Sequence, residues 1–139
     1  MKSKITNTHL IIRIDKGENL VESLNAACNE HKVISASISG IGATDYFKCG
    51  VFNLQTKEYK ELEFSGTYEI LALCGNITQK DCKTYFHAHI TVGDENGHSF
   101  GGHLIEARIS ATCEIVLDLI ECQIERRLDQ VSGLNLLDL

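Results

Sequence analysis

Apolar and polar residues alternate with a period of two over most of this chain, which is typical of strands that bury one face. The clearest case begins at residue 33, where Ile34, Ala36 and Ile38 alternate with three serines. Near the end of the chain, Ile115 and Leu117 alternate with two acidic residues and a valine. The pattern predicts strands over 8–14, 33–39, 46–54, 58–64, 67–78, 84–92 and 112–123.

Only one segment has the spacing of a helix. Leu20, Leu24, Ala27 and Cys28 recur every three to four residues, and they predict a helix over about 18–31. A single helix against six or more strands favours an α+β domain, with a largely antiparallel β-sheet and one main helix packed on it. The 139 residues contain no Pro and no low-complexity run, and they suit one domain over residues 1–139.

Turn-forming residues separate the predicted strands. Gly40-Ile41-Gly42 interrupts one alternating segment and predicts a bulge or a close approach of two backbones. Gln55-Thr56-Lys57 lies between two strands and predicts a hairpin. Asp94-Glu95-Asn96-Gly97 predicts a turn that folds residues 98–104 back beside 84–92.

Two histidines occupy alternate positions of one predicted strand. Because residues two apart in a strand face the same side, His87 and His89 lie next to each other, while Ala88 and Ile90 face the core. Side by side, two imidazoles can converge on one metal ion. The pair alone also fits a simpler interpretation, in which both are polar residues on a solvated face of the sheet.

A third histidine follows the turn, in Gly101-Gly102-His103-Leu104. The two glycines allow the backbone to pass close to the preceding strand, so the predicted reversal can bring His103 to His87 and His89. Three neutral imidazoles with an open fourth position are the ligand set of a catalytic-type zinc site, although iron, nickel and copper also bind imidazole. We therefore predict a divalent metal ion, with zinc as the first expectation, at His87, His89 and His103.

Other ionisable residues could contribute to this site or lie apart from it. Glu69 lies in a predicted strand, where it either orients a ligand imidazole through a hydrogen bond or faces solvent. His98 adjoins the turn and is expected to be exposed, and His9 is expected to be structural. The sequence identifies no nucleophile or general base, so it leaves open whether the protein is an enzyme.

The net charge and the cysteines indicate which kinds of partner the protein can bind and in which compartment it is expected. The net charge is −6, and the basic pairs Lys2/Lys4 and Arg126/Arg127 are flanked by acids, so we interpret them as solvated surface charge and not as a nucleic-acid footprint. The six cysteines form no CxxC pair, and no apolar stretch is long enough for an export signal or a membrane span. These features predict a cytoplasmic protein with reduced, mostly buried thiols and no membrane partner.

In this order and spacing, several segments resemble the PPC domain, also called DUF296, over nearly the whole chain. They are Arg13 with Gly17-Glu18-Asn19-Leu20, Ser39-Gly40-Ile41-Gly42-Ala43, Gly66-Thr67-Tyr68-Glu69-Ile70-Leu71, His87-Ala88-His89, Gly101-Gly102-His103-Leu104, and Arg126 with the closing segment 129–137. The resemblance implies an α+β homotrimer with a metal held by His87, His89 and His103.

Members of that family are often labelled DNA-binding, by analogy with plant proteins that carry an AT-hook. This chain has no Arg-Gly-Arg-Pro core and no Pro at all, so the arginine motif that inserts into the minor groove of DNA is absent. The first hypothesis is therefore a trimeric metal-binding module that binds or transforms a small molecule. The alternatives are a DNA-binding regulator without an AT-hook and a module for protein–protein assembly.

Overall fold

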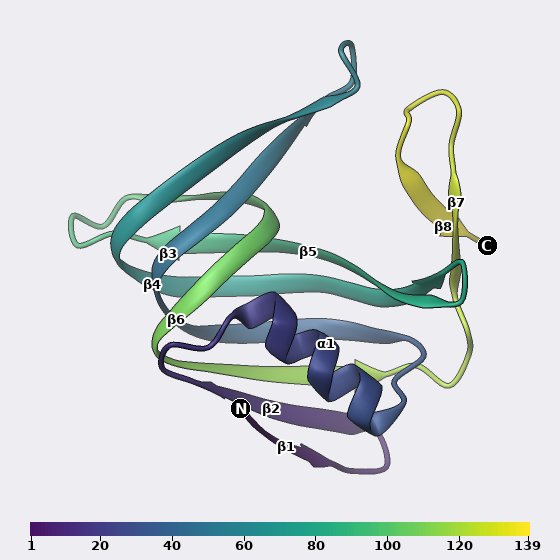
Figure 1. The fold of residues 1–139 in the computed structure, drawn as a ribbon, viewed down its shortest axis with the longest axis horizontal. Helices are drawn as coiled ribbons and strands as arrows, with labels where there is room; N and C mark the ends of the chain where they lie inside the picture. The colour runs from purple at the N-terminus through teal and green to yellow at the C-terminus, as the bar shows by residue number, and fades with distance from the viewer.

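Eight strands and one helix make up the protein in the computed structural model, which describes residues 1–139 (Figure 1). The helix α1 spans Leu20–His31. The strands are β1 (Lys2–Ile5), β2 (His9–Asp15), β3 (Ala36–Asn53), β4 (Glu58–Lys80), β5 (Lys83–Gly93), β6 (Ser99–Leu119), β7 (Glu125–Leu128) and β8 (Asn135–Asp138). The predicted α+β class with a mainly antiparallel sheet is confirmed.

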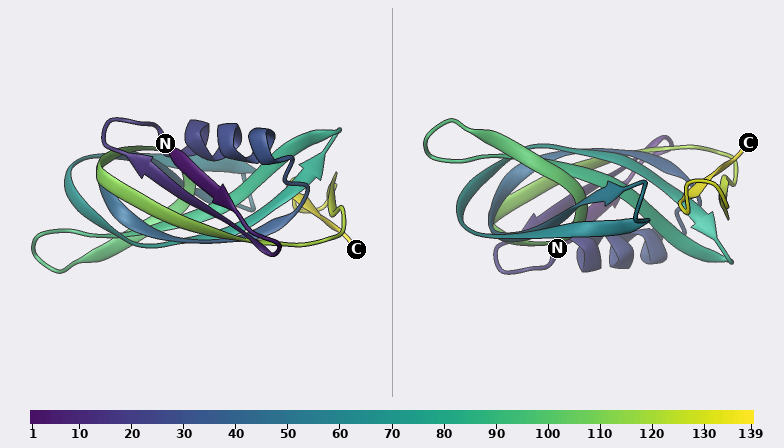
Figure 2. Two further views of the ribbon diagram at one scale, coloured as in Figure 1. Left: turned by 90° about the horizontal axis from the view of Figure 1, so that it is seen from below. Right: turned by 90° about the horizontal axis from the view of Figure 1, so that it is seen from above.

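The strands form one sheet in the order β1-β2-β6-β3-β4-β7-β8, and β5 joins it by pairing with both β4 and β6. Every pairing is antiparallel except the single contact between β4 and β7, which is parallel. Because β3 pairs with β4 and β6, and β5 also pairs with β4 and β6, these four strands close into a ring. Figure 2 shows the resulting curvature, with α1 packed along one side.

Helix α1 begins two residues later than the sequence spacing predicts. The Asn19 side chain accepts a hydrogen bond from the backbone N–H of Glu22 at 3.1 Å, so Asn19 caps the helix from outside it. The helix ends at His31 and is capped by Lys32, which adopts the left-handed conformation with φ of 53°. Its buried face carries the apolar residues of the predicted helical stripe, which are Leu20, Leu24, Ala27 and Cys28.

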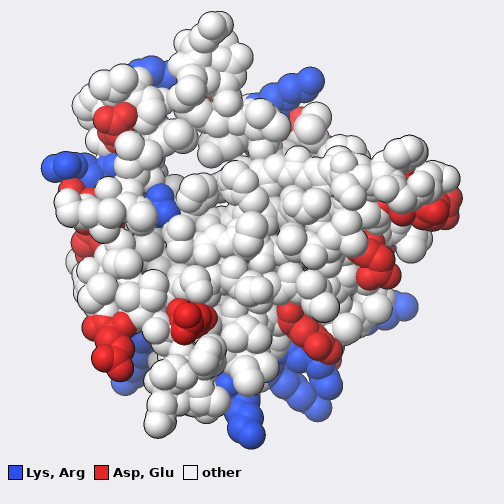
Figure 3. Space-filling model, turned by 180° about the vertical axis from the view of Figure 1, so that it is seen from behind, with Lys and Arg blue, Asp and Glu red and all other residues white.

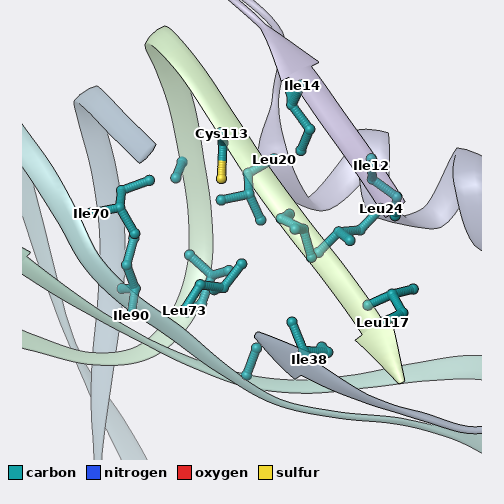
Figure 4. Packing of buried hydrophobic residues seen from close by; sticks show 14 of the residues in the cluster. Ile12, Ile14, Leu20, Leu24, Ile38, Ile70, Leu73, Ile90, Cys113 and Leu117 are labelled. Carbon is teal, nitrogen blue, oxygen red and sulfur yellow. The ribbon is translucent and has the colours of Figure 1, made fainter. Parts of the chain in front are cut away.

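The core lies between α1 and the inner face of the sheet (Figure 4). Ile12 and Ile14 from β2 meet Ile115 and Leu117 from β6, and all four are fully buried. Each such side chain contributes about 1.5–3 kcal/mol when it leaves water. A second part of the core is aromatic: the ring of Phe47 stacks on that of Phe64 with centroids 4.9 Å apart.

Three strands are much longer than predicted. Strand β3 continues through Gly40-Ile41-Gly42, with the predicted bulge present as a shift of its register against β4. Strand β4 runs through Gly66 without a break, and β6 joins the two segments expected at 98–104 and 112–123. Around Gly40 and Gly42, pairing with β4 and β6 on both sides holds the backbone of β3 extended where the local sequence alone would interrupt it. The short strands β1, β7 and β8 were not predicted.

All six cysteines are free. Cys28, Cys49 and Cys113 are buried, and burial raises the pKa of Cys28 and of Cys113 to about 12, so these thiols stay protonated. The sequence predicted that most of the thiols are buried. This prediction is wrong for the other three cysteines, because Cys74, Cys82 and Cys122 are exposed. Helix α1 lacks the length and apolarity needed to cross a bilayer.

Candidate metal centre

Strand β5 positions the first two histidines. Ala88, Ile90 and Val92 alternate with them and are buried in the core, so His87 and His89 project from the opposite face of the strand. His89 is exposed and His87 is half-buried. The strand is therefore anchored by its apolar positions and presents both imidazoles outward, as the alternation predicts.

The turn after β5 brings the third histidine back. The side chain of Asp94 accepts hydrogen bonds from the backbone N–H groups of Asn96 at 2.9 Å and His98 at 2.8 Å, and Gly97 supplies the left-handed residue with φ of 81°. Strand β6 then pairs with β5 so that His103 lies directly opposite His89. The predicted turn is confirmed, and it sets the register of the site.

Two glycines let the strands around the histidines approach closely. A Cβ atom on Gly101 would lie 1.9 Å from the carbonyl oxygen of Ile90, and one on Gly75 would lie 2.1 Å from the carbonyl oxygen of His87. Both neighbours are backbone atoms that cannot swing away. Glycine is thus required at both positions for β5 to sit between β4 and β6.

The three imidazoles form a nearly equilateral triangle. Their ring centroids lie 5.4 Å apart for His87 and His89, 5.5 Å for His87 and His103, and 5.7 Å for His89 and His103. One ligand nitrogen from each ring can be chosen so that all three lie within 4.8 Å of one another. The structure brings together the three histidines that the sequence singled out.

The surroundings of His87 and His103 lower the pKa values of these two imidazoles and so favour the neutral form, which is the form that binds metals. Burial lowers the pKa of His87, and the charge of Arg126 and the neighbouring His89 lower it further. Burial also lowers the pKa of His103, with smaller effects from His87 and His89. Neutral imidazole has a free lone pair, so both rings are available as ligands at neutral pH.

One buried atom of this site has no hydrogen-bond partner within the chain. The Nδ1 atom of His103 is shielded from solvent and makes no hydrogen bond, although the Tyr59 ring packs over this imidazole with centroids 5.2 Å apart. An unsatisfied buried nitrogen is costly unless a ligand is present. Together with the all-imidazole donor set, it fits a divalent cation such as zinc.

Arg126 also borders this site, and sequence reasoning placed it wrongly on the solvated surface. Its side chain is buried, and it donates hydrogen bonds to Thr78 Oγ1 at 2.8 Å, the carbonyl oxygen of Asn135 at 2.6 Å and Asn76 Oδ1 at 2.6 Å. Its Nη2 atom lies 3.4 Å from Nδ1 of His87. Alternation within β7 would have indicated that only one of the two adjacent arginines faces outward.

Glu69 is not brought to the histidines. It pairs with Gly93 at the far end of β5, four residues beyond His89, and it is exposed. It lines a different hollow of the sheet with Ile41, Leu71 and Glu114. A strand rises about 3.3 Å per residue, so within one chain Glu69 is too distant to orient a ligand imidazole.

The two remaining candidates lie apart from the site. His98 is exposed and pairs with Asp94, with Nδ1 and the carboxylate 3.1 Å apart. His9 is exposed at the start of β2, with Nε2 3.7 Å from the carboxylate of Asp118. Neither ring belongs to the cluster of three.

Known structures share both the fold and much of the sequence. A candidate DNA-binding protein from Bacteroides thetaiotaomicron is 34% identical, with a TM-score of 0.95 over 99% of this chain and 96% of that one. A metal-containing protein from Archaeoglobus fulgidus is 33% identical, with a TM-score of 0.86 over 98% and 96%. A plant- and prokaryote-conserved (PPC) protein from Pyrococcus horikoshii is 32% identical, with a TM-score of 0.87 over 99% and 94%.

A curated relative and a family match complete the comparison. The bifunctional protein GlmU of Synechococcus sp. (strain JA-3-3Ab) is 30% identical over 125 residues, which are 88% of this chain, but the chain spans only 19% of that protein. Residues 1–121 match the Plants and Prokaryotes Conserved (PCC) domain, the family that the sequence motifs resemble. The chain therefore belongs to the Plants and Prokaryotes Conserved domain family.

Proposed function

We propose that this protein binds one divalent metal ion, zinc in the first instance, through His87, His89 and His103, and that it binds or transforms a small molecule beside the ion. The observation that carries the proposal is the convergence of three ligand nitrogens to within 4.8 Å of one another. When bound, a divalent cation supplies Lewis acidity at its open coordination position. The buried, unpartnered Nδ1 of His103 and the lowered pKa values of His87 and His103 support this reading.

The protein's own residues would hold the ion rigidly. His87 and His89 are fixed by the buried side of β5, and His103 is fixed by its pairing with His89. No Asp, Glu or Cys belongs to the cluster, so all donors would come from imidazole. An incomplete ligand shell of this kind leaves room for a ligand from solution.

Zinc titration of untagged protein, first treated with a chelator, tests the proposal. Calorimetry should show one zinc ion per chain for the wild type and none for the His87→Ala/His89→Ala double variant. His98→Ala is the matched control, because this exposed histidine adjoins the site in sequence but lies outside the cluster, and it should bind zinc normally. A wild-type chain that takes up no zinc contradicts the proposal.

We also propose that the functional unit is a homotrimer in the cytoplasm, as the family resemblance implies. Apolar side chains on the sheet face that α1 does not cover support association: Ile11, Ile41, Leu71 and Val116 are 46%, 60%, 50% and 41% exposed. Figure 3 views the molecule from behind, where much of the middle of the surface carries no charge. Light scattering should give three times the chain mass of 15.4 kDa.

DNA binding is a second candidate, because the Bacteroides thetaiotaomicron relative is described in those terms. In Figure 3 the Lys and Arg side chains are interspersed with Asp and Glu near the margin and form no continuous basic stripe. A protein that contacts phosphates loses affinity steeply with salt, with a slope of about −0.9 for each phosphate contacted. Undetectable binding to duplex DNA at low salt would eliminate this candidate.

A further inference from the structure

Arg126 differs from the other three arginines of the chain in having no acidic partner. Arg13 pairs with Asp15 at 3.0 Å, Arg108 with Asp45 at 2.8 Å and Arg127 with Asp138 at 3.1 Å, all at the surface.

Arg126 is only 9% exposed, yet no carboxylate lies within ion-pair distance of its guanidinium. The most deeply buried cation of this acidic chain is thus the arginine that lacks a counter-ion. A buried charge without a counter-ion is costly, which suggests that a ligand supplies one.

Neutral groups hold the guanidinium in place without neutralising it. Thr78, Asn76 and the carbonyl of Asn135 accept its three shortest hydrogen bonds, at 2.8, 2.6 and 2.6 Å. The Tyr85 ring lies against it, with the guanidinium carbon 4.9 Å from the ring centroid. These neutral partners fix the side chain in orientation and leave its charge without a counter-ion.

The guanidinium of Arg126 lies next to the histidine cluster. Nη2 of Arg126 lies 3.4 Å from Nδ1 of His87, which is the longest of its polar contacts and the one that a ligand can replace most readily. The three histidines include no acidic neighbour in their cluster. With a divalent cation bound, this corner would be strongly positive, although the chain as a whole carries −6.

We propose that the site takes a small oxyanion, a carboxylate or a phosphate, and that Arg126 is its anion-binding residue. The inference rests on the proposed metal site and names the class of ligand that it accepts. Guanidinium groups bind carboxylates and phosphates through charge-assisted hydrogen bonds. Arg126 lies in β7, beyond residues 1–121 that match the family, and the β7–β8 hairpin carries it to the sheet where β7 meets β4 (Figure 1).

Calorimetric titration of zinc-loaded, untagged protein with inorganic phosphate and, separately, with acetate tests the proposal. Arg126→Gln should weaken the binding of the preferred anion by about tenfold or more, because a charge-assisted contact is lost. Arg127→Gln is the matched control: its side chain is adjacent, exposed and paired with Asp138, and its removal should leave the affinity unchanged. The tighter of the two anions identifies the ligand as a phosphate or a carboxylate.

Several outcomes overturn the proposal. Equal anion affinity in the wild type and Arg126→Gln would do so, as would binding of neither anion by the zinc-loaded wild type. Should Arg126→Gln fail to fold, as judged by circular dichroism, Arg126→Lys replaces it. Lysine keeps the charge but loses the planar pair of donors, so the affinity should fall by about tenfold, and an unchanged affinity overturns the proposal.

A zinc titration of the same samples separates this inference from the proposed function. Failure of the wild type to take up zinc refutes the metal site itself. Phosphate binding by metal-free protein then tests Arg126 independently: it should be weak in the wild type and weaker in Arg126→Gln, and equal affinities count against the role of the arginine. Normal zinc uptake with equal anion affinities refutes only the anion-binding role.

Discussion

The sheet beneath α1 and the end that carries the histidines are held together in different ways. Between the helix and the sheet, Leu24 of α1 and Ile12 and Leu117 of the sheet are at most 1% exposed. Around the histidines, the packing depends on backbone approaches at Gly75 and Gly101 and on the hydrogen bonds of one buried arginine.

This difference predicts different responses to mutation. Apolar cores tolerate changes of shape but lose stability when volume is removed. At the histidine end, a single methyl group added to Gly75 or Gly101 would collide with backbone. We therefore expect the helix-covered half to control stability and the histidine end to control ligand affinity.

The largest effect on stability is expected for Ile115→Ala. This side chain is fully buried beneath α1, and its truncation removes apolar contacts and leaves a cavity. The free energy of unfolding should fall by about 2–5 kcal/mol, measured by urea denaturation. Zinc affinity at a temperature where the variant is folded should not change, and a marked loss would show that the two regions are coupled.

Gly101→Ala should lower both the stability of the protein and its affinity for zinc. Its Cβ would meet the carbonyl oxygen of Ile90 at 1.9 Å, so β5 and β6 must separate where His89 faces His103. We expect a loss of about 1–3 kcal/mol in stability and weaker zinc binding. Gly93→Ala is the control, because its Cβ would meet only the flexible side chain of Leu71, at 3.2 Å. Equal effects of the two substitutions would refute the argument from close approach.

Removal of the metal should destabilise the wild type without unfolding it. A ligand present at one hundred times its dissociation constant stabilises the folded state by about 2.7 kcal/mol, so adding zinc to metal-free protein should raise the melting temperature. The apolar core forms without the ion, so metal-free protein should still unfold cooperatively. A melting temperature that does not respond to zinc would contradict the proposed site.

The stability of metal-free protein should also depend on pH, with a smaller effect than the removal of the metal and with a sign that the structure determines. Because the pKa values of His87 and His103 are lowered in the folded state, the unfolded chain takes up protons first as the pH falls below about 6.5. Stability should therefore decline below that pH and level off below the folded-state pKa values. Urea denaturation at several pH values should show a weaker decline in His87→Gln/His103→Gln, and an identical decline would refute this origin.

The smallest effect is expected at the tip of the β3–β4 hairpin. Lys57 donates a hydrogen bond from Nζ to the carbonyl oxygen of Gln130 at 3.2 Å, in an exposed position. Lys57→Ala should change the free energy of unfolding by less than about 0.5 kcal/mol. A larger loss by thermal denaturation would show that the contact between this hairpin and the closing segment contributes to the fold.

Local patterns were sufficient for much of the fold and for the histidine cluster. The alternation around His87 and His89 fixed which residues face the core, and Asp94 to Gly97 formed the expected turn. The strand lengths could not be predicted in this way. Gly66 looks like an end when only its neighbours in sequence are considered, but β3 pairs with β4 on either side of it, at Ser65 and Tyr68, and β4 continues through it.

Two features of the site could not be decided from the sequence, for the same reason. Glu69 lies in a strand, as expected, but the register of β4 against β5 places it opposite Gly93 and away from His89. Arg126 looks like surface charge among acidic neighbours, yet the β7–β8 hairpin folds it beside Asn76 and His87. In both cases the side chain's environment depends on strands distant in the sequence.

The sequence by itself determined the class of fold, the faces of the strands and the pairing of His87 with His89, because these depend on a period of two within a few residues. Tertiary structure alone decided that a buried arginine without an acidic partner lies beside the histidines, and that Glu69 does not. Register and strand crossing bring together residues far apart in the sequence, such as Asn76 and Arg126, which are 50 positions apart. No local pattern encodes such contacts, because they are fixed by the packing of the whole sheet.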